Sequence, residues 1–274
     1  MKHPLDDSWS SQPYTGVERR KRKPLLKMRL RDFDVDQAAT YMLTNRRTAE
    51  QGVGLFVTPN IQHVADMRTN PEFAAAMQGA QIVVCDGFPV FRYAQLQGQA
   101  LPGRITGRDV IDRMLAEPER LADHRMFFVV DSEETVAATR AWMAEHAPFA
   151  ALELLIPPFG FDADPDYSAD LAARITAFGA TLLFLCVGAP RSEIFVHRHR
   201  SLLPPCWALC VGQSFKIALG LTSPPPALMV QLNLEWLWRI LLEPRRMLRR
   251  YGPSSLGFLV SVLADLRRSR PRRP

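Results

Sequence analysis

The chain has no long apolar run and no recognisable targeting segment. None of its apolar stretches approaches the roughly 20 residues that a transmembrane helix requires, and its polar beginning lacks the apolar centre of a signal peptide. The glycine-rich loops GxGxxG and GxxxxGK(S/T) are also missing, which excludes two familiar nucleotide-binding fingerprints. We therefore expect a cytoplasmic protein in which any nucleotide site is built by other residues.

Cysteine is scarce, and its spacing indicates neither a metal site nor a redox site. The four cysteines lie within or beside apolar runs, without any CxxC pair: Cys85, Cys186, Cys206 and Cys210. We expect them to be small core residues in a reducing compartment. Two histidines, His197 and His199, stand two residues apart on a predicted helix and so point to different sides. We expect no metal and no other cofactor.

The net charge of +6 is divided unevenly along the chain. Residues 1–31 hold nine Lys and Arg against three Asp and Glu, and residues 239–274 hold ten against two. The stretch between them carries about eight more acidic than basic side chains. Basic ends on an acidic body can meet either nucleic acid or anionic lipid.

The two basic ends differ in what accompanies their charge. Residues 1–27 combine Ser, Pro and Asp with a basic run, a composition typical of a disordered tail. Residues 226–274 mix arginines with Trp236, Trp238 and several leucines, as interfacial amphipathic segments do. We therefore expect a C-terminal helical appendage that binds a membrane surface, and no nucleic-acid partner. A solvated basic face is the alternative for the final arginines.

Residues 28–225 alternate strand-like and helix-like stretches, which predicts an α/β core. Six short apolar runs are expected to be strands: Val53–Val57, Gln81–Cys85, Met126–Val130, Ala151–Leu155, Thr181–Val187 and Cys206–Val211. Stretches with helical periodicity separate most of them: Asp34–Thr48, Pro71–Met77, Pro89–Leu96, Gly107–Leu115, Glu133–Glu145, Pro165–Phe178 and Arg191–Leu202. This order indicates a Rossmann-like, mostly parallel sheet with helices on both faces and ligands at the carboxyl ends of the strands.

The turns after the predicted strands carry the candidate site. Glycine follows three strands, as Gly87, Gly188 and Gly212, where it permits a sharp turn and close approach to a diphosphate. Asp86 directly follows an apolar run, so its carboxylate should lie partly desolvated in the crevice and suits a general base. Capping of the helix that follows is the alternative role for Asp86.

Two further turns offer polar groups. Thr58 and Asn60 follow another strand and could orient the hydroxyls of a sugar, or Asn60 could simply stabilise the turn. The segment from Arg104 to Asp109 places cations and a hydroxyl just before a helix, an arrangement that can bind phosphate. A plain helix start capped by Thr106 is the alternative there.

The last long segment has a charged helical stripe. Arg239, Arg246 and Arg250 recur at helical spacing, with Trp236 near the same stripe. Arginines beside an apolar face can hold a diphosphate whose lipid tail lies in a membrane, and an ordinary exposed face is the alternative. Pro244 should kink this segment or start a second helix.

Taken in order, these residues resemble the WecG/TagA/CpsF family of bacterial glycosyltransferases, from about Leu30 to Phe258. The matching blocks are Thr58-Pro-Asn60 followed by His63, Asn70-Pro-Glu-Phe73, Asp86-Gly87, Arg104-Ile-Thr-Gly-Arg-Asp109, Val187-Gly-Ala-Pro190 with Glu193, Val211-Gly212 with Phe215 and Gly220, and Leu234-Glu-Trp-Leu-Trp-Arg239 through Glu243-Pro-Arg-Arg246 to Arg250-Tyr251. So many ordered blocks make the resemblance specific.

The resemblance implies a metal-independent, inverting transfer of a hexose or N-acetylhexosamine from a UDP-sugar donor to a sugar on undecaprenyl diphosphate. Such a reaction would serve exopolysaccharide, capsule or cell-wall polymer synthesis at the inner face of the cell membrane. Asp86 would be the base, and Arg239, Arg246 and Arg250 would hold the lipid diphosphate. The expected substrate-binding residues are Thr58, Asn60, Gly87, Arg104, Thr106, Gly107, Asp109, Gly188, Pro190, Ser192, Glu193 and Gly212. A homo-oligomer is left open.

Three positions depart from the family pattern. Ser192 replaces a Gln, Lys216 stands where an Asp is usual, and a basic Lys-Arg-Ala-Pro block is replaced by residues 223–226, Ser-Pro-Pro-Pro. These changes bear on the identity of the donor sugar. They also motivate an alternative function, a non-catalytic nucleotide-sugar-binding or scaffold member of a membrane polysaccharide-assembly complex.

Overall fold

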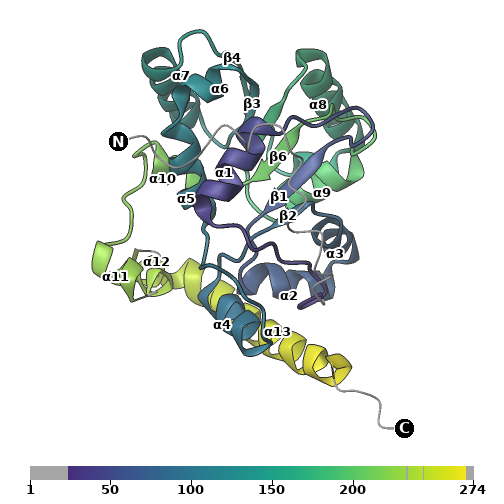
Figure 1. The fold of residues 1–274 in the computed structure, drawn as a ribbon, viewed down its shortest axis with the longest axis vertical. Coiled ribbons are helices and arrows are strands. Elements are labelled where there is room, and N and C mark those ends of the chain that lie inside the picture. Colours follow the sequence, from purple (N-terminus) through teal and green to yellow (C-terminus); the bar gives the residue numbers. More distant parts are fainter. Residues whose placement is uncertain (1–23, 233, 243, 270–274) are drawn as a thin grey trace.

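The computed structural model describes residues 24–232, 234–242 and 244–269, and its centre is a six-stranded sheet (Figure 1). The strands are β1 Gly54–Val57, β2 Ile82–Val83, β3 Arg125–Val129, β4 Ala151–Leu155, β5 Leu182–Leu185 and β6 Trp207–Cys210. Neighbouring strands run parallel in the order β2-β1-β6-β5-β3-β4. Each strand overlaps a predicted run, so the expected α/β fold with a parallel sheet is confirmed.

Helices cover both faces of the sheet because successive strand residues point to opposite sides. Phe56 and Phe128 belong to one core layer, whereas their neighbours Val57 and Phe127 belong to the other. The first layer is completed by α1 Val35–Thr44, α5 Gly107–Leu115, α6 Pro118–Ala122, α7 Glu133–His146 and α10 Ser214–Ala218. The second is completed by α2 Ile61–Thr69, α3 Pro71–Gln78, α4 Phe88–Leu96, η2 Phe161–Ala163, α8 Pro165–Phe178 and α9 Arg191–Arg198. All four cysteines are buried, as predicted.

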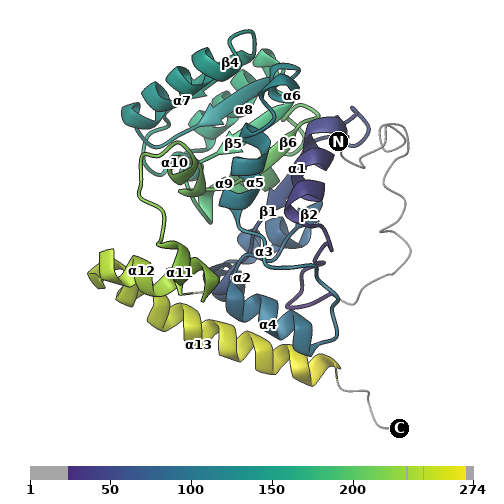
Figure 2. The same ribbon diagram turned by 60° about the vertical axis from the view of Figure 1, so that its left-hand side comes forward.

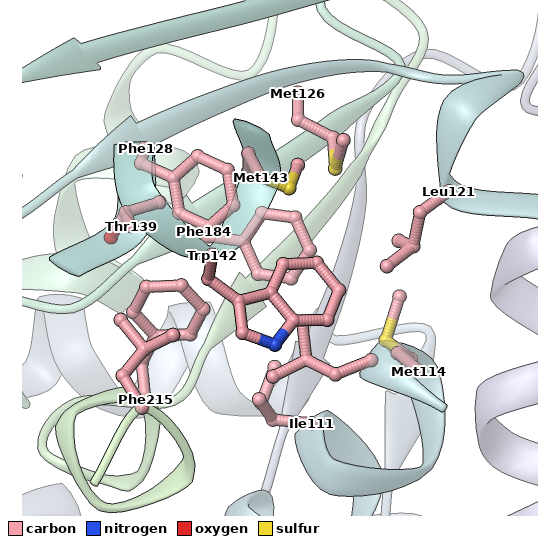
Figure 3. A pocket seen from close by; sticks show the side chains of 12 residues that line it. Ile111, Met114, Leu121, Met126, Phe128, Thr139, Trp142, Met143, Phe184 and Phe215 are labelled. Carbon is pink, nitrogen blue, oxygen red and sulfur yellow. The ribbon is translucent and has the colours of Figure 1, made fainter. Parts of the chain in front are cut away.

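The first layer is closely packed beneath β3. Figure 3 shows Phe128, Phe184, Trp142 and Phe215 converging there from strands and helices. The rings of Phe128 and Phe184 stack with their centroids 4.4 Å apart. The cavity left between these side chains is only about 10 Å³, close to the smallest space that holds one water. It is therefore a gap in the core and is too small for a nucleotide or a sugar.

Three α-helices of the core, α2, α6 and α10, were not predicted from the sequence. The α2 sequence is polar and only weakly periodic, and neither of the two alternatives for Asn60, a sugar contact or a turn, predicted a helix there. In the structure, Asn60 is the N-cap of α2, and α2 packs along the C-terminal helix α13. Tertiary packing thus stabilises a helix that periodicity alone does not indicate.

The C-terminal segment forms α11 Ala227–Gln231, α12 Glu235–Leu242 and α13 Pro244–Ser269, so Pro244 starts a helix. Helix α13 runs beside α4 and α2 (Figures 1 and 2). A Cβ atom on Gly257 would lie only 2.7 Å from the Ala65 Cβ of α2. The Tyr93 hydroxyl of α4 donates a 2.9 Å hydrogen bond to buried Asp265. One side of α13 is therefore part of the packed fold.

The predicted N-terminal tail lies mostly outside the described residues. Residues 1–23 are not described, but Leu25 and Leu26 are buried in the core, and Leu25 forms a short antiparallel bridge with Met28. Within the described residues, packing thus begins slightly before Met28, where we expected the core to start.

Candidate active site

A cleft of about 440 Å³ opens at the carboxyl ends of β1, β2 and β6. The turns after these strands form one side, and residues of α10 to α13 form the other. Six predicted site residues line it: Asn60, Asp86, Gly87, Arg104, Thr106 and Asp109. The volume lies within the range typical of small-molecule sites, and the position at strand ends is where open parallel sheets bind ligands.

Asp86 occupies the turn between β2 and α4. The N-cap of α4 is Gly87, so Asp86 does not take the capping position that was the alternative for it. Its Oδ1 lies 3.8 Å from a terminal nitrogen of Arg104, and 26% of its side chain is exposed. A neighbouring guanidinium favours the ionised carboxylate, which is the form that can accept a proton.

Arg104 lies between two carboxylates. It pairs with Asp86 and also with Glu235 of α12, whose Oε1 is 2.5 Å from Arg104 Nη2. Glu235 was not predicted as a site residue, although it falls within the Leu234-to-Arg239 block. The Arg104 guanidinium in the cleft is thus already paired with a carboxylate of the C-terminal helices.

Asn60 caps α2 and also lies in the wall of the cleft, and its contact with a sugar stays a prediction. Its Oδ1 accepts hydrogen bonds from the backbone N–H groups of Gln62, at 2.9 Å, and His63, at 3.4 Å, so it caps α2. It also lines the cleft. A Cβ atom on Gly87 would lie 2.9 Å from Asn60 Cα, so glycine at this position lets the Asp86 turn pass directly against Asn60.

The start of α5 forms another wall of the cleft. Thr106 and Asp109 make a capping box, in which the Thr106 hydroxyl accepts from the Asp109 N–H at 3.1 Å and Asp109 accepts from the Thr106 N–H at 3.0 Å. Thr106 therefore caps α5 and also lines the cleft, while binding of phosphate by this segment stays a prediction. A Cβ atom on Gly107 would lie 3.2 Å from the Ser214 hydroxyl and 3.5 Å from that of Thr58. Glycine here allows α5 to approach the ends of β1 and β6.

The turns after β5 and β6 meet each other beside the cleft-forming strands. Gly188 and Gly212 both adopt positive φ angles, 83° and 51°, and a Cβ on Gly212 would lie 3.6 Å from Gly188 Cα. The buried Ser192 hydroxyl donates to the Gly188 carbonyl at 3.2 Å. Pro190, which precedes α9, and these three residues are not among those that line the cleft. Their contact with substrate stays a prediction.

Glu193 is almost completely buried, with 2% exposure, and does not line the cleft. Its Oε1 lies 3.8 Å from His63 Nε2, and His63 Nδ1 lies 3.0 Å from Asn60 Oδ1. Burial raises the pKa of Glu193 to about 7, and the nearby Asp66 acts in the same direction. The structure thus connects Glu193 to the cleft through His63, whereas direct substrate contact by Glu193 stays a prediction.

Lys216, one of the departures from the family pattern, has a local structural partner. Its ammonium lies 3.3 Å from Asp131 Oδ2, which also accepts from the Gln213 side chain at 3.2 Å. Burial opposes ionisation of Asp131, but its hydrogen bonds from Gln213, Lys216 and Thr135 lower its pKa. The lysine that stands in place of the usual Asp therefore forms an ion pair that joins α10 to the end of β3.

The predicted lipid-diphosphate residues are only partly described. Arg239 lies on α12, and Arg246 and Arg250 lie on α13, but the placement of their side chains falls outside the described residues. Within residues 24–232, 234–242 and 244–269, no three His, Cys, Asp or Glu side chains cluster so as to hold a metal ion. No helix in the same ranges is long and apolar enough to cross a bilayer.

Several lining residues were not among the predicted site residues: Phe88, Arg108, Ser214, Glu235, Trp236 and Tyr251. All but Phe88 and Ser214 lie inside sequence blocks already singled out. Ser214 follows the Gly212 turn closely, and Phe88 directly follows Asp86-Gly87. Each of these residues lies in or next to a sequence block that matches the family, which could have drawn attention to it. The sequence alone does not show which of them face the cleft.

The sequence is similar to those of known glycosyltransferases. Residues 23–272 match the model of the glycosyl transferase WecG/TagA/CpsF family. A relative from Bacillus spizizenii, the N-acetylglucosaminyldiphosphoundecaprenol N-acetyl-beta-D-mannosaminyltransferase, is 28% identical over 218 residues. That match covers 78% of this chain and 82% of the relative.

Proposed function

The chain belongs to the WecG/TagA/CpsF family of glycosyltransferases, and we propose that it moves a hexose or N-acetylhexosamine from a UDP-sugar to a sugar on undecaprenyl diphosphate. The pairing of Asp86 with Arg104, in a cleft between strand ends and the C-terminal helices, is the observation that carries the proposal. The name of the Bacillus relative supports a lipid-diphosphate-linked acceptor.

Asp86 is the proposed general base. Its carboxylate takes the proton of the acceptor hydroxyl while that oxygen bonds to the anomeric carbon of the donor. The bond from this carbon to the UDP oxygen breaks, and attack from the opposite side inverts the configuration. Arg104 and Arg108, which both line the cleft, stabilise the charge that develops on the departing UDP. We assign the lipid diphosphate to Arg239, Arg246 and Arg250.

A membrane surface is the proposed docking partner of α13. Its packed side contacts α2 and is bonded to Tyr93 of α4, while the other side exposes a row of apolar residues at helical spacing: Leu256, Leu259, Val260, Leu263 and Leu266. Exposed Arg245 and Arg267 flank this row. An apolar stripe with flanking cations suits an anionic bilayer, which would place the cleft beside a lipid-linked acceptor and make the protein peripheral on the inner face of the membrane.

The transfer reaction is tested by incubating the purified protein with a panel of UDP-sugars and short-chain polyprenyl-diphosphate sugars. We expect release of UDP and a lengthened lipid-linked sugar with at least one pair, and no product from nucleoside-diphosphate sugars that lack uracil. UDP binding without transfer by any pair would contradict the proposal and favour the non-catalytic alternative.

Membrane docking is tested by sedimentation with vesicles that contain anionic lipid. The double substitution Leu259→Glu and Leu263→Glu places two negative charges on the exposed row, and we expect it to reduce the bound fraction at least tenfold. The control, Phe149→Glu with Leu202→Glu, changes two exposed apolar residues elsewhere by the same charge. Equal binding by both variants and the unmodified protein would refute the assignment of the surface.

A further inference from the structure

A buried pair of titratable side chains is connected to the cleft through Asn60. Glu193 lies near the start of α9, and Ile194, Phe195 and Val196 beside it belong to the hydrophobic core. Its Oε1 faces His63 at 3.8 Å, while its Oε2 is buried without a hydrogen-bond partner among the described residues. A buried carboxyl oxygen without a partner is costly, and a well-packed apolar residue would avoid that cost.

His63 has two contacts with Asn60 that require different positions of its ring proton. Its Nδ1 lies 3.3 Å from the Asn60 backbone nitrogen and 3.0 Å from Asn60 Oδ1. Accepting from the backbone N–H requires a lone pair on Nδ1, whereas donating to Oδ1 requires a proton there. Which nitrogen of an imidazole carries the proton is decided by what the other nitrogen contacts. In His63 the other nitrogen, Nε2, faces Glu193.

We propose that Glu193 and His63 are positioning residues, which together select the contact that His63 makes with Asn60 and so fix the Asn60 side chain in the wall of the cleft. This inference rests on the proposed transfer reaction for its meaning in catalysis. An ionised Glu193 attracts a proton on Nε2, which leaves Nδ1 as an acceptor for the Asn60 N–H. A neutral Glu193 can donate toward Nε2, which places a proton on Nδ1 and directs it to Asn60 Oδ1.

The position of Asn60 matters because of its neighbours in the cleft. The Asp86 turn passes directly against it, since a Cβ on Gly87 would touch Asn60 Cα. The Asn60 Oδ1 is engaged by the α2 cap and by His63, which leaves the Nδ2 group as the donor that this side chain can offer to a sugar hydroxyl or phosphate. A small displacement of Asn60 would therefore misplace a donor beside the proposed base.

The first test follows Asn60 directly, without substrate. In ¹⁵N-labelled protein, the Asn60 side-chain amide signals, assigned by their loss in Asn60→Ser, should shift between pH 5.5 and 8.5 with a midpoint near 7. The groups that face Glu193 are His63 and Asp66 of α2 and the Cys210 thiol at the end of β6. Glu193→Gln should abolish this transition while leaving the signals in place. A transition that persists in Glu193→Gln would overturn the proposal even if the protein were to catalyse no transfer.

The second test separates positioning from simple stability. In the transfer assay, Glu193→Ala should lower kcat about tenfold, with little change in the KM for the donor. The Gln amide can donate toward His63 Nε2 as neutral Glu193 does, so Glu193→Gln should restore kcat and remove the fall in kcat as the pH rises through 7. Ser168→Ala serves as the matched control, because Ser168 is buried and bonds His199 at 3.0 Å at the other end of α9. Equal kcat losses in Glu193→Ala and Ser168→Ala, or no rescue by Glu193→Gln, would show that Glu193 has only a structural role.

Discussion

The two carboxylates connected to Asn60 stand in opposite environments. Asp86 lies in the open cleft, with 26% of its side chain exposed and a guanidinium 3.8 Å away. Glu193 lies in the core with 2% exposure, has an imidazole at 3.8 Å, and has one oxygen without a partner among the described residues. One carboxylate is therefore stabilised as an anion where substrate can reach it, and the other is held close to its titration point where substrate cannot.

Two properties therefore distinguish the proposed base from the supporting acid. Substrate can reach the Asp86 carboxylate, and a neighbouring guanidinium compensates its charge. A base must contact the hydroxyl that it deprotonates, and among these two only Asp86 lines the cleft. Burial raises the pKa of Glu193 to about 7, so its proton is exchanged near neutral pH without contact with the reacting atoms. The sequence alone grouped both residues as members of one site.

The largest expected effect comes from removing the charge of Asp86. Asp86→Asn keeps the size of the side chain but removes its ability to accept a proton, so we expect turnover to fall by ~100-fold or more. UDP binding and the melting temperature should stay close to those of the unmodified protein. Steady-state kinetics, calorimetric UDP binding and thermal unfolding measure the three properties.

The control for this change is Asp36→Asn, which neutralises an exposed carboxylate on α1 that pairs with Arg113. It should leave turnover unchanged. Turnover by Asp86→Asn within a few-fold of the unmodified protein would remove Asp86 from the role of base. The comparison would then point to another acceptor of the proton in the cleft.

A smaller effect is expected from the pH dependence of stability. Because the folded protein holds the Glu193 proton up to about pH 7, it binds more protons than the unfolded chain between about pH 4.5 and 7. The contribution of Glu193 to stability is therefore largest at low pH and is lost as the pH rises through 7. Glu193→Gln should remove about 2 kcal/mol of this pH-dependent loss. Urea unfolding at pH 5 and pH 8 measures it, and parallel changes in both proteins would contradict the burial argument.

The parts of the site that the sequence predicted are those set by local order. Asp86 follows a strand, Thr106 precedes a helix, and the apolar runs mark the strands, so their positions at one edge of the sheet follow from parallel topology. The capping box of Thr106 and Asp109 is likewise readable from their spacing of three residues.

The remaining features depend on contacts between distant segments. The pairing of Arg104 with Glu235 joins residues 131 apart, and the hydrogen bond from Tyr93 to Asp265 joins residues 172 apart. Neither pair has a periodic or local signal, and the packing of α2 against α13 has none either. The exposed and packed sides of α13 could not be told apart from composition, because both contain apolar residues.

The smallest expected effect concerns Glu235, a third carboxylate, which shares Arg104 with Asp86. If Glu235 competes with phosphate for the guanidinium, Glu235→Gln should strengthen UDP binding about threefold, in line with the modest energy of partly exposed ion pairs. Glu119→Gln on α6 removes the same charge at an exposed position and should leave the Kd unchanged. Weaker UDP binding by Glu235→Gln would instead show that Glu235 holds Arg104 in the orientation that the nucleotide needs. Calorimetric titration of both variants with UDP at low ionic strength therefore decides whether Glu235 weakens UDP binding or orients Arg104 for it.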